Sequence, residues 1–211
     1  MTNVQPTAFI EVGKPGGGKG TVLQLLKQRI EERQQTVFTS DTGEMFRMMI
    51  KSNHGSLINA NDRMKERIKE INNASLLQVS PLAGALWTTL FLQKYEWEQP
   101  YIIMDGSPRR GVELLMLEEF LDEFIQANIQ FISIETDDEV VIERMLERHK
   151  NAPRPETSSR EAIMVRLNQY HKLVGPTIEQ IKGRYENNGL ITIYNNGSLE
   201  ELKLQVNRIA L

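Results

Sequence analysis

The stretch Gly13-Lys14-Pro15-Gly16-Gly17-Gly18-Lys19-Gly20-Thr21 decides the fold of this chain. It follows a largely apolar run at residues 8–12 and precedes apolar residues at helical spacing. A buried strand, a glycine-rich turn and a helix N-terminus, in that order, form a cradle for phosphate. The glycines let backbone N–H groups converge, and the helix dipole favours an anion at the same place. Lys19 adds a full positive charge, and Thr21 adds a hydroxyl that can reach Mg²⁺. A glycine-rich hairpin is the alternative, and the strand–turn–helix context argues against it.

Length and composition indicate one soluble, intracellular domain. Of the 211 residues, 40% are hydrophobic, which is enough to form a sizeable core. The net charge of −3 does not show the excess of basic residues that is typical of nucleic-acid-binding domains. The chain has no cysteine, which excludes disulfides and thiolate metal sites, and its three histidines match no ligand spacing. It contains neither an apolar run of about 18 residues nor a leader-like N-terminus. We therefore expect a cytoplasmic protein without a membrane or nucleic-acid partner.

Apolar strands alternate with amphipathic helices along most of the chain. This order predicts an α/β fold in which a parallel sheet carries helices on both faces. Five strands are expected, at residues 8–12, 37–40, 102–105, 129–135 and 190–194. After the helix that follows the glycine-rich stretch, further helices are expected at residues 62–73 (capped by Asn61 or Asp62), about 81–95, 113–127, 137–150 and 159–184, and after Ser198.

Charged and glycine residues follow the strands at their carboxyl ends, where open α/β sheets bind ligands. Residues 41–47 follow the second strand, and residues 105–110 follow the third. Guanidinium groups suit phosphate oxygens because they are always charged and bind in a bidentate manner. Each arginine alone could instead pair with an acid on a helix face, but together with Lys19 they favour a polyphosphate site. The arginines expected near this rim are Arg47, Arg109, Arg144, Arg148, Arg154 and Arg166.

Asp105 ends an apolar strand at this rim. An aspartate in that place can hold the hydration shell of Mg²⁺, and the Thr21 hydroxyl is the second group expected to reach the ion. The alternative is an aspartate that caps a helix or forms a turn. The sequence favours the magnesium role because Asp105 follows a strand of the same sheet as the glycine-rich turn.

These motifs resemble those of the adenylate kinase family of nucleoside monophosphate kinases. The family's phosphate loop G-x-P-G-x-G-K-G-T matches residues 13–21, and it explains why Gly20 departs from the strict pattern G-x-x-x-x-G-K-[ST]. Its S-T-G-D-x-x-R segment resembles residues 41–47, and its D-G-F-P-R turn resembles residues 105–109. The family's lid pattern resembles Arg144, Arg148, residues 154–157 and residues 166–167. The family's loop at the ATP base resembles residues 196–198.

The resemblance implies a P-loop NTPase fold in one domain over residues 1–211. The implied parts are a core (1–40, 96–143 and 159–211), a helical lobe for the nucleoside monophosphate (41–95) and a short lid (144–158). The implied reaction is transfer of the ATP γ-phosphoryl group to AMP or a related nucleoside monophosphate. Mg²⁺ is the implied cofactor, the short lid leaves no place for zinc, and we expect a monomer.

The resemblance also assigns roles to individual residues. It implies catalytic roles for Lys19, Arg109, Arg144, Arg154 and Arg166. It implies ATP binding by Gly13, Gly16, Gly17, Gly18, Lys19, Gly20, Thr21, Arg144, Arg148 and Gly197. It implies acceptor binding by Thr42, Arg47, Gly106, Arg109 and Glu113, and a magnesium site, through water or directly, at Thr21 and Asp105.

One departure from the family concerns the acceptor base. The family's adenylate kinases have glutamine four residues after the arginine of D-G-F-P-R, and here that position is Glu113. A glutamine amide can donate to and accept from adenine, whereas a carboxylate only accepts, which complements the two Watson–Crick donors of guanine. Glu113 therefore raises the hypothesis of a kinase that prefers GMP or CMP. The alternative is an acidic residue in the first turn of a helix, where the dipole favours it.

Two further departures leave a second function open. Ser107 replaces the aromatic residue of D-G-F-P-R, and Glu156-Thr157 replaces two aspartates that follow the lid arginine. A nucleotide-binding P-loop module with weak or no transfer activity is therefore the alternative to an enzyme. The retained lysine, arginines and Asp105 favour the enzyme.

Overall fold

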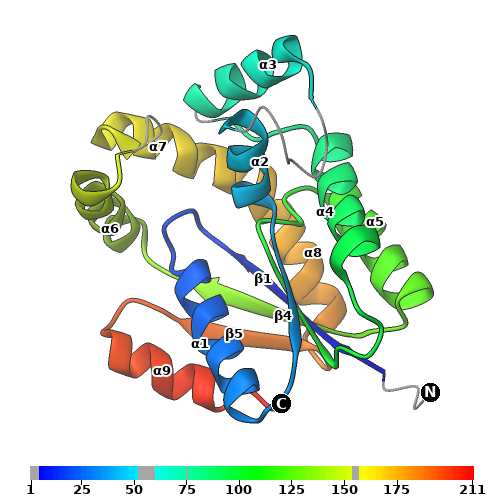
Figure 1. Cartoon of the computed structure of the whole chain (residues 1–211). Helices are drawn as coiled ribbons and strands as arrows, with labels where there is room; N and C mark the ends of the chain where they lie inside the picture. The colour runs from blue at the N-terminus through cyan, green and yellow to red at the C-terminus, as the bar shows by residue number, and fades with distance from the viewer. Residues whose placement is uncertain (1–4, 52–59, 75, 154–156) are drawn as a thin grey trace.

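The computed structural model describes residues 5–51, 60–74, 76–153 and 157–211, and these residues adopt the predicted α/β architecture (Figure 1). Within them, five parallel strands form one sheet in the order β2-β3-β1-β4-β5. Each predicted strand boundary lies within one residue of the observed one. The strands are β1 (Thr7–Gly13), β2 (Val37–Asp41), β3 (Tyr101–Asp105), β4 (Asn128–Glu135) and β5 (Leu190–Tyr194).

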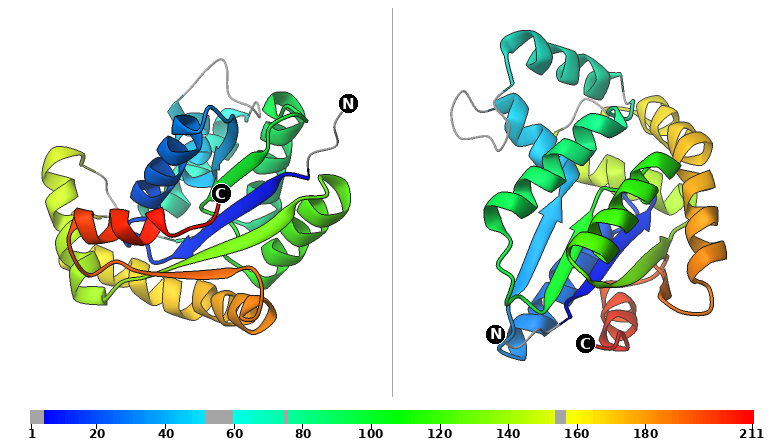
Figure 2. Two further views of the ribbon diagram at one scale, coloured as in Figure 1. Left: turned by 90° about the horizontal axis from the view of Figure 1, so that it is seen from below. Right: turned by 90° about the vertical axis from the view of Figure 1, so that its right-hand side faces the viewer.

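Helices cover both faces of the sheet (Figure 2). The side chains of a strand alternate between the two faces, so Phe9 of β1 points one way and Ala8 and Ile10 point the other. Phe9 packs with α1 and α9, whereas Ala8 and Ile10 share a core with α4, α5 and α8. The helices are α1 (Lys19–Glu32), α2 (Thr42–Lys51), α3 (Asp62–Asn73), α4 (Ser80–Lys94), α5 (Gly111–Glu119), α6 (Asp138–Asn151), α7 (Arg160–Gln169), α8 (Gly175–Tyr185) and α9 (Leu199–Asn207), with π-helical segments η1 (Phe120–Phe124) and η3 (Tyr170–Val174).

Three of the predicted helix starts are confirmed by capping contacts. Asn61 accepts a hydrogen bond from the Met64 N–H at 3.0 Å and caps α3. Ser159 caps α7 in the same way, and Ser198 forms a capping box with Glu201 at the start of α9. These side chains satisfy backbone N–H groups that a helix leaves free at its first turn.

The predicted helix at 113–127 differs from the structure. Helix α5 begins two residues earlier, at Gly111, and it changes into the π-helical segment η1 before the predicted end. The wider π turn shifts the residues that follow it around the helix axis. Phe124 is therefore 55% exposed and stacks on Phe120, although helical spacing predicts it on the buried face.

The described residues between β2 and β3 form the helices α2, α3 and α4 and no strand. In Figure 1, α3 lies at the top of the molecule, beyond the carboxyl ends of the strands. This arrangement accords with a helical lobe at 41–95, but the division into core, lobe and lid stays a prediction. None of the described helices combines the length and the apolar character that a bilayer span requires.

Candidate functional site

The phosphate loop, residues 13–21, joins β1 to α1. Gly18 caps α1 with a φ of +98°, and a Cβ atom there would overlap the side-chain amide of Asn195, so glycine is required. The Gly17 carbonyl accepts hydrogen bonds from Thr136 Oγ1 at 3.1 Å and from Asn195 Nδ2 at 2.8 Å. The segments after β4 and β5 therefore hold the loop, and the start of α1 opens to a cavity.

This cavity has a volume of about 580 Å³ and lies at the carboxyl ends of the strands. Its size is typical of a site for a small ligand. The cavity brings together residues predicted to bind ATP and residues predicted to bind the acceptor. The predicted site residues that line it are Gly13, Gly16, Gly18, Lys19, Gly20, Thr21, Arg47, Asp105, Gly106, Arg109, Arg144, Arg148, Arg166 and Gly197.

Three predicted site residues do not line the cavity, and a fourth lies outside the described residues. Gly17 is buried behind the phosphate loop, where its carbonyl is already hydrogen-bonded. Thr42 is buried at the start of α2, and Glu113 is buried in α5; neither lines the cavity. Arg154 lies outside the described residues, so its predicted role is carried forward without a structural account.

Lys19 lies at the centre of the positive charge in the cavity. Its Nζ donates to the carbonyl oxygens of Gly13 at 3.2 Å and Lys14 at 3.0 Å, so the side chain folds back along the phosphate loop. Burial lowers the pKa of the Lys19 amine, and the nearby Asp105 carboxylate opposes that change. The ammonium group is placed where a phosphate bound at the loop would meet it.

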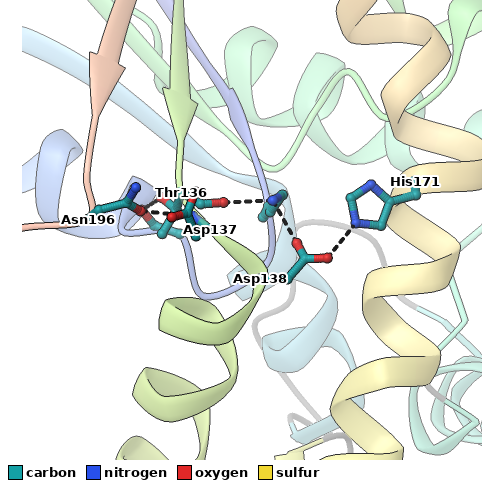
Figure 3. A network of polar contacts seen from close by, with 7 residues as sticks. Thr136, Asp137, Asp138, His171 and Asn196 are labelled. Atoms are coloured by element: carbon teal, nitrogen blue, oxygen red, sulfur yellow. Dashed lines mark hydrogen bonds and ion pairs between the residues drawn. The ribbon is translucent and has the colours of Figure 1, made fainter.

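A polar network ties the phosphate loop to the start of α6 and to η3 (Figure 3). Lys14 Nζ donates to the Thr136 carbonyl at 2.7 Å and pairs with Asp138 Oδ1 at 2.6 Å. His171 Nε2 lies 3.0 Å from Asp138 Oδ2. Burial alone would raise the pKa of Asp138, but Lys14 and His171 outweigh it and lower that pKa. The network therefore links the start of α6 to η3 through Asp138 and joins both to the phosphate loop through Lys14.

The loop between β5 and α9 is held against α6 by a second set of contacts. The Asp137 N–H donates to Asn196 Oδ1 at 2.8 Å (Figure 3). Arg144 donates to the carbonyls of Asn195 at 2.8 Å and Gly197 at 3.1 Å. Arg144 thus lines the cavity while positioning the loop that the sequence assigns to the ATP base.

A row of carboxylates crosses the floor of the cavity, and the sequence predicts only one of its members as a site residue. Asp41 of β2, Asp105 of β3 and Glu11 of β1 occupy paired positions in neighbouring strands. Burial raises the pKa of Asp105 and raises that of Glu11 well above its ordinary value; each of these two groups is a close neighbour of Lys19. The sequence carries one indication of Glu11, a charged residue inside an apolar strand, but the register with Asp105 exists only in the fold.

The residues of this cavity fit a magnesium ion that is held mainly by water and phosphate. Asp105 Oδ1 is buried without a hydrogen-bond partner among the described residues, and Thr21 lines the same cavity. Mg²⁺ at nucleotide sites takes one or two carboxylates and fills its remaining positions with phosphate and water. The described part of the chain has no group of three or more acidic, histidine or cysteine side chains placed for a metal.

Glu113 has contacts that differ from its predicted role at the acceptor base. Its Oε1 accepts from Ser80 Oγ at 2.8 Å, and its Oε2 accepts from Ser107 Oγ at 3.2 Å and from the Arg109 N–H at 2.7 Å. The carboxylate therefore joins α4 and α5 to the turn that carries Arg109. The base contact stays a prediction, and these hydrogen bonds favour a positioning role. The Ser107 hydroxyl, which replaces an aromatic residue of the family pattern, is one of the donors.

Replacing Glu113 with leucine is expected to lower the free energy of unfolding by about 2–4 kcal/mol, because it leaves two buried hydroxyl donors and one partly buried N–H without their acceptor. Urea unfolding followed by circular dichroism measures the change. Glu119→Leu at the exposed end of α5 is the matched control, with an expected change of about 0.5 kcal/mol or less. Equal stability of the two variants would contradict the structural role of the carboxylate.

Comparison with known proteins agrees with the fold and the cavity. A family model described as adenylate kinase matches residues 11–186. The adenylate kinase of Flavobacterium johnsoniae is 26% identical over 190 residues, which cover 90% of each chain. The adenylate kinase of Corynebacterium diphtheriae is 28% identical over 194 residues, or 92% of this chain and 93% of the relative. That of a Synechococcus strain is 29% identical over 84% of this chain and 85% of its own.

The match to the family model includes the end of β1, the phosphate loop, the helices after β2, the turn with Arg109 and the arginines of α6 and α7. The match thus includes most of the residues that line the cavity, whereas the lining residues Asn195, Gly197, Leu199 and Leu202 lie beyond its end. Because the family model matches most of this chain and the parallel sheet carries the phosphate loop that the family pattern requires, this chain belongs to the adenylate kinase family.

Proposed function

We propose that this protein transfers the γ-phosphoryl group of ATP to AMP or a related nucleoside monophosphate, giving ADP and a nucleoside diphosphate. The observation that carries this proposal is the distribution of positive charge around one cavity. Lys19 comes from the phosphate loop, Arg47 from α2 and Arg109 from the turn after β3, and the remaining arginines come from α6 and α7. A site for a single phosphate group would not need cations from so many elements.

The chemistry follows from the charge of the transferred group. Phosphoryl transfer places negative charge on the oxygens around the moving phosphorus, so catalysis consists of positioning and cationic stabilisation without a covalent intermediate. Lys19 and the phosphate loop would hold the ATP phosphates, with Arg144 and Arg148. Arg47 and Arg109 would hold the phosphate of the acceptor. Arg154 and Arg166 would approach the reacting group when the lid closes and excludes water.

Mg²⁺ belongs to this proposal because family members generally act on its complex with ATP. Thr21 and Asp105 would hold it, directly or through water, and both line the cavity. When bound, the ion neutralises phosphate charge. The lobe at 41–95 would bind the acceptor and the residues at 144–158 would form the lid. We further propose a cytoplasmic monomer without zinc.

The two alternatives to this reaction receive less support. A binding module without transfer activity would not need cations at both the ATP part and the acceptor part of the cavity. A preference for GMP or CMP depends on Glu113, whose carboxylate already accepts three hydrogen bonds inside the protein. Because the curated relatives are adenylate kinases, we propose AMP as the preferred acceptor.

An acceptor panel tests the proposed function. Purified protein with ATP and Mg²⁺ is expected to use AMP with a kcat/KM at least about tenfold above those for GMP, CMP and UMP, since a base-binding site rejects an unmatched donor pattern. A coupled assay of ADP formation gives the rates, and a reaction without acceptor measures hydrolysis. Tight nucleotide binding without turnover on any acceptor would reject the enzyme, whereas fastest turnover with GMP would restore the base-reading role of Glu113.

A further inference from the structure

Glu11 is a carboxylate in the middle of a core strand. The residue is 1% exposed, and its neighbours Ile10 and Val12 are buried apolar residues. Neither carboxylate oxygen has a hydrogen-bond partner within the described part of the chain. A buried carboxylate without a partner is destabilising, because it loses its hydration and gains no donor in return. Since the side chain lines the cavity, a ligand can supply the missing partner.

The position of Glu11 in the sheet narrows the choice of partner. Glu11 and Asp105 are paired residues of the parallel strands β1 and β3, which places their side chains on the same face, with the strands about 4.8 Å apart. Asp105 Oδ1 also lacks a hydrogen-bond partner among the described residues. The third acid of the row, Asp41, is already engaged, because it accepts from the Glu44 N–H and pairs with Arg47. The unsatisfied oxygens therefore belong to Glu11 and Asp105.

The protein's own cations do not satisfy Glu11. Lys19 is a basic neighbour of Glu11, but the Lys19 Nζ donates to two backbone carbonyls, and no ion pair within 4.0 Å joins Lys19 to Glu11 in the described residues. ATP by itself would make the situation worse, because its phosphates bring negative charge toward two carboxylates. A divalent cation that enters with the phosphates turns this repulsion into attraction, since the ion attracts both the carboxylates and the phosphate oxygens.

We propose that Glu11 is a second carboxylate of the magnesium site, beside Asp105, and that it accepts hydrogen bonds from water molecules bound to the ion. This inference rests on the proposed function, because the ion arrives with ATP. It assigns a binding role to a residue that the sequence places in an apolar strand.

The proposal predicts how much Mg²⁺ strengthens nucleotide binding. Isothermal titration calorimetry with the non-hydrolysable analogue AMP-PNP, once with EDTA and once with excess Mg²⁺, gives two dissociation constants, and their ratio is the gain from the ion. In Glu11→Gln and Glu11→Leu this gain is expected to fall at least about tenfold, as is usual when an outer partner of a metal is removed. Metal-free AMP-PNP is expected to bind these variants as well as the wild type or more tightly, because a negative charge has been removed.

A control variant shows whether the loss is specific to the magnesium site. Glu135→Gln, at the end of β4, removes a carboxylate that pairs with Lys182 and does not line the cavity, so its gain from Mg²⁺ should equal that of the wild type. Both Glu11 variants should melt at or above the wild-type temperature. The role of Glu11 would be overturned if Mg²⁺ strengthened AMP-PNP binding to Glu11→Gln as much as it does in the wild type. It would also be overturned if the substitution tightened AMP-PNP binding equally with and without Mg²⁺. Absence of AMP-PNP binding by the wild type would instead overturn the proposed function.

Discussion

Replacing Lys19 with methionine is expected to lower kcat at least about 100-fold while leaving the protein folded. Lys19 lines the cavity at the start of α1, and its partly buried ammonium group lies close to Asp105 and Arg109. A partly buried cation is screened less by solvent than an exposed one, so its loss is expected to be felt mainly in the transition state, where negative charge develops. Methionine keeps most of the volume and the flexibility of the lysine side chain and removes only the charge.

A coupled assay with saturating ATP and AMP measures this effect. Lys27→Met is the matched control, because Lys27 lies on the same helix, is partly exposed and pairs only loosely with Glu31 at 3.7 Å. Its kcat should stay within about twofold of the wild type, as expected for a surface ion pair. Thermal unfolding of both variants checks that they fold. Turnover of Lys19→Met at the wild-type rate would remove Lys19 from the mechanism.

Replacing Arg109 with alanine is expected to lower kcat/KM for the acceptor at least about 100-fold. Arg109 follows β3, lines the cavity and has its backbone N–H fixed by Glu113 at 2.7 Å. The guanidinium group of Arg109, carried on this fixed backbone, can bind phosphate with two parallel hydrogen bonds. Arg109→Lys keeps the charge but not the forked geometry, so it should recover only part of the loss.

The neighbouring arginine provides the control for this prediction. Arg110 donates to the Gln78 carbonyl at 2.7 Å and does not line the cavity. Arg110→Ala should therefore change kcat/KM no more than a few-fold, although it can reduce stability. Equal losses in Arg109→Ala and Arg110→Ala would show that the turn is sensitive to any change, and that Arg109 has no particular role at the acceptor phosphate.

The strands, the caps and the phosphate loop could be predicted from the sequence because each depends on neighbours along the chain. Apolar runs define β1 and β3, and side chains such as Asn61 and Ser198 satisfy the first N–H groups of their own helices. The end of α5 could not be predicted in this way. The π-helical segment that exposes Phe124 depends on packing against other elements, and local spacing does not contain that information.

Glu113 shows the same limit of prediction from local sequence, here within the site. Its distance along the chain from Arg109 predicts a residue at the acceptor base, and that assignment stays a prediction. The fold, however, places Ser80 of α4 and Ser107 within hydrogen-bond distance of its carboxylate. The spacing of a motif identifies which residue occupies a motif position. It does not show which donors from other parts of the fold will form hydrogen bonds with that residue.

By itself, the sequence determined the order of strands and helices, the phosphate loop and the family, since these follow from local patterns and short motifs. The tertiary structure alone decided which side chains share one cavity. Glu11 and Asp105 are far apart along the chain, and only the pairing of β1 with β3 places them side by side beneath the phosphate loop. The physical reason is that a parallel sheet aligns the carboxyl ends of distant strands, so the charge and hydrogen bonding of the site arise from register and burial.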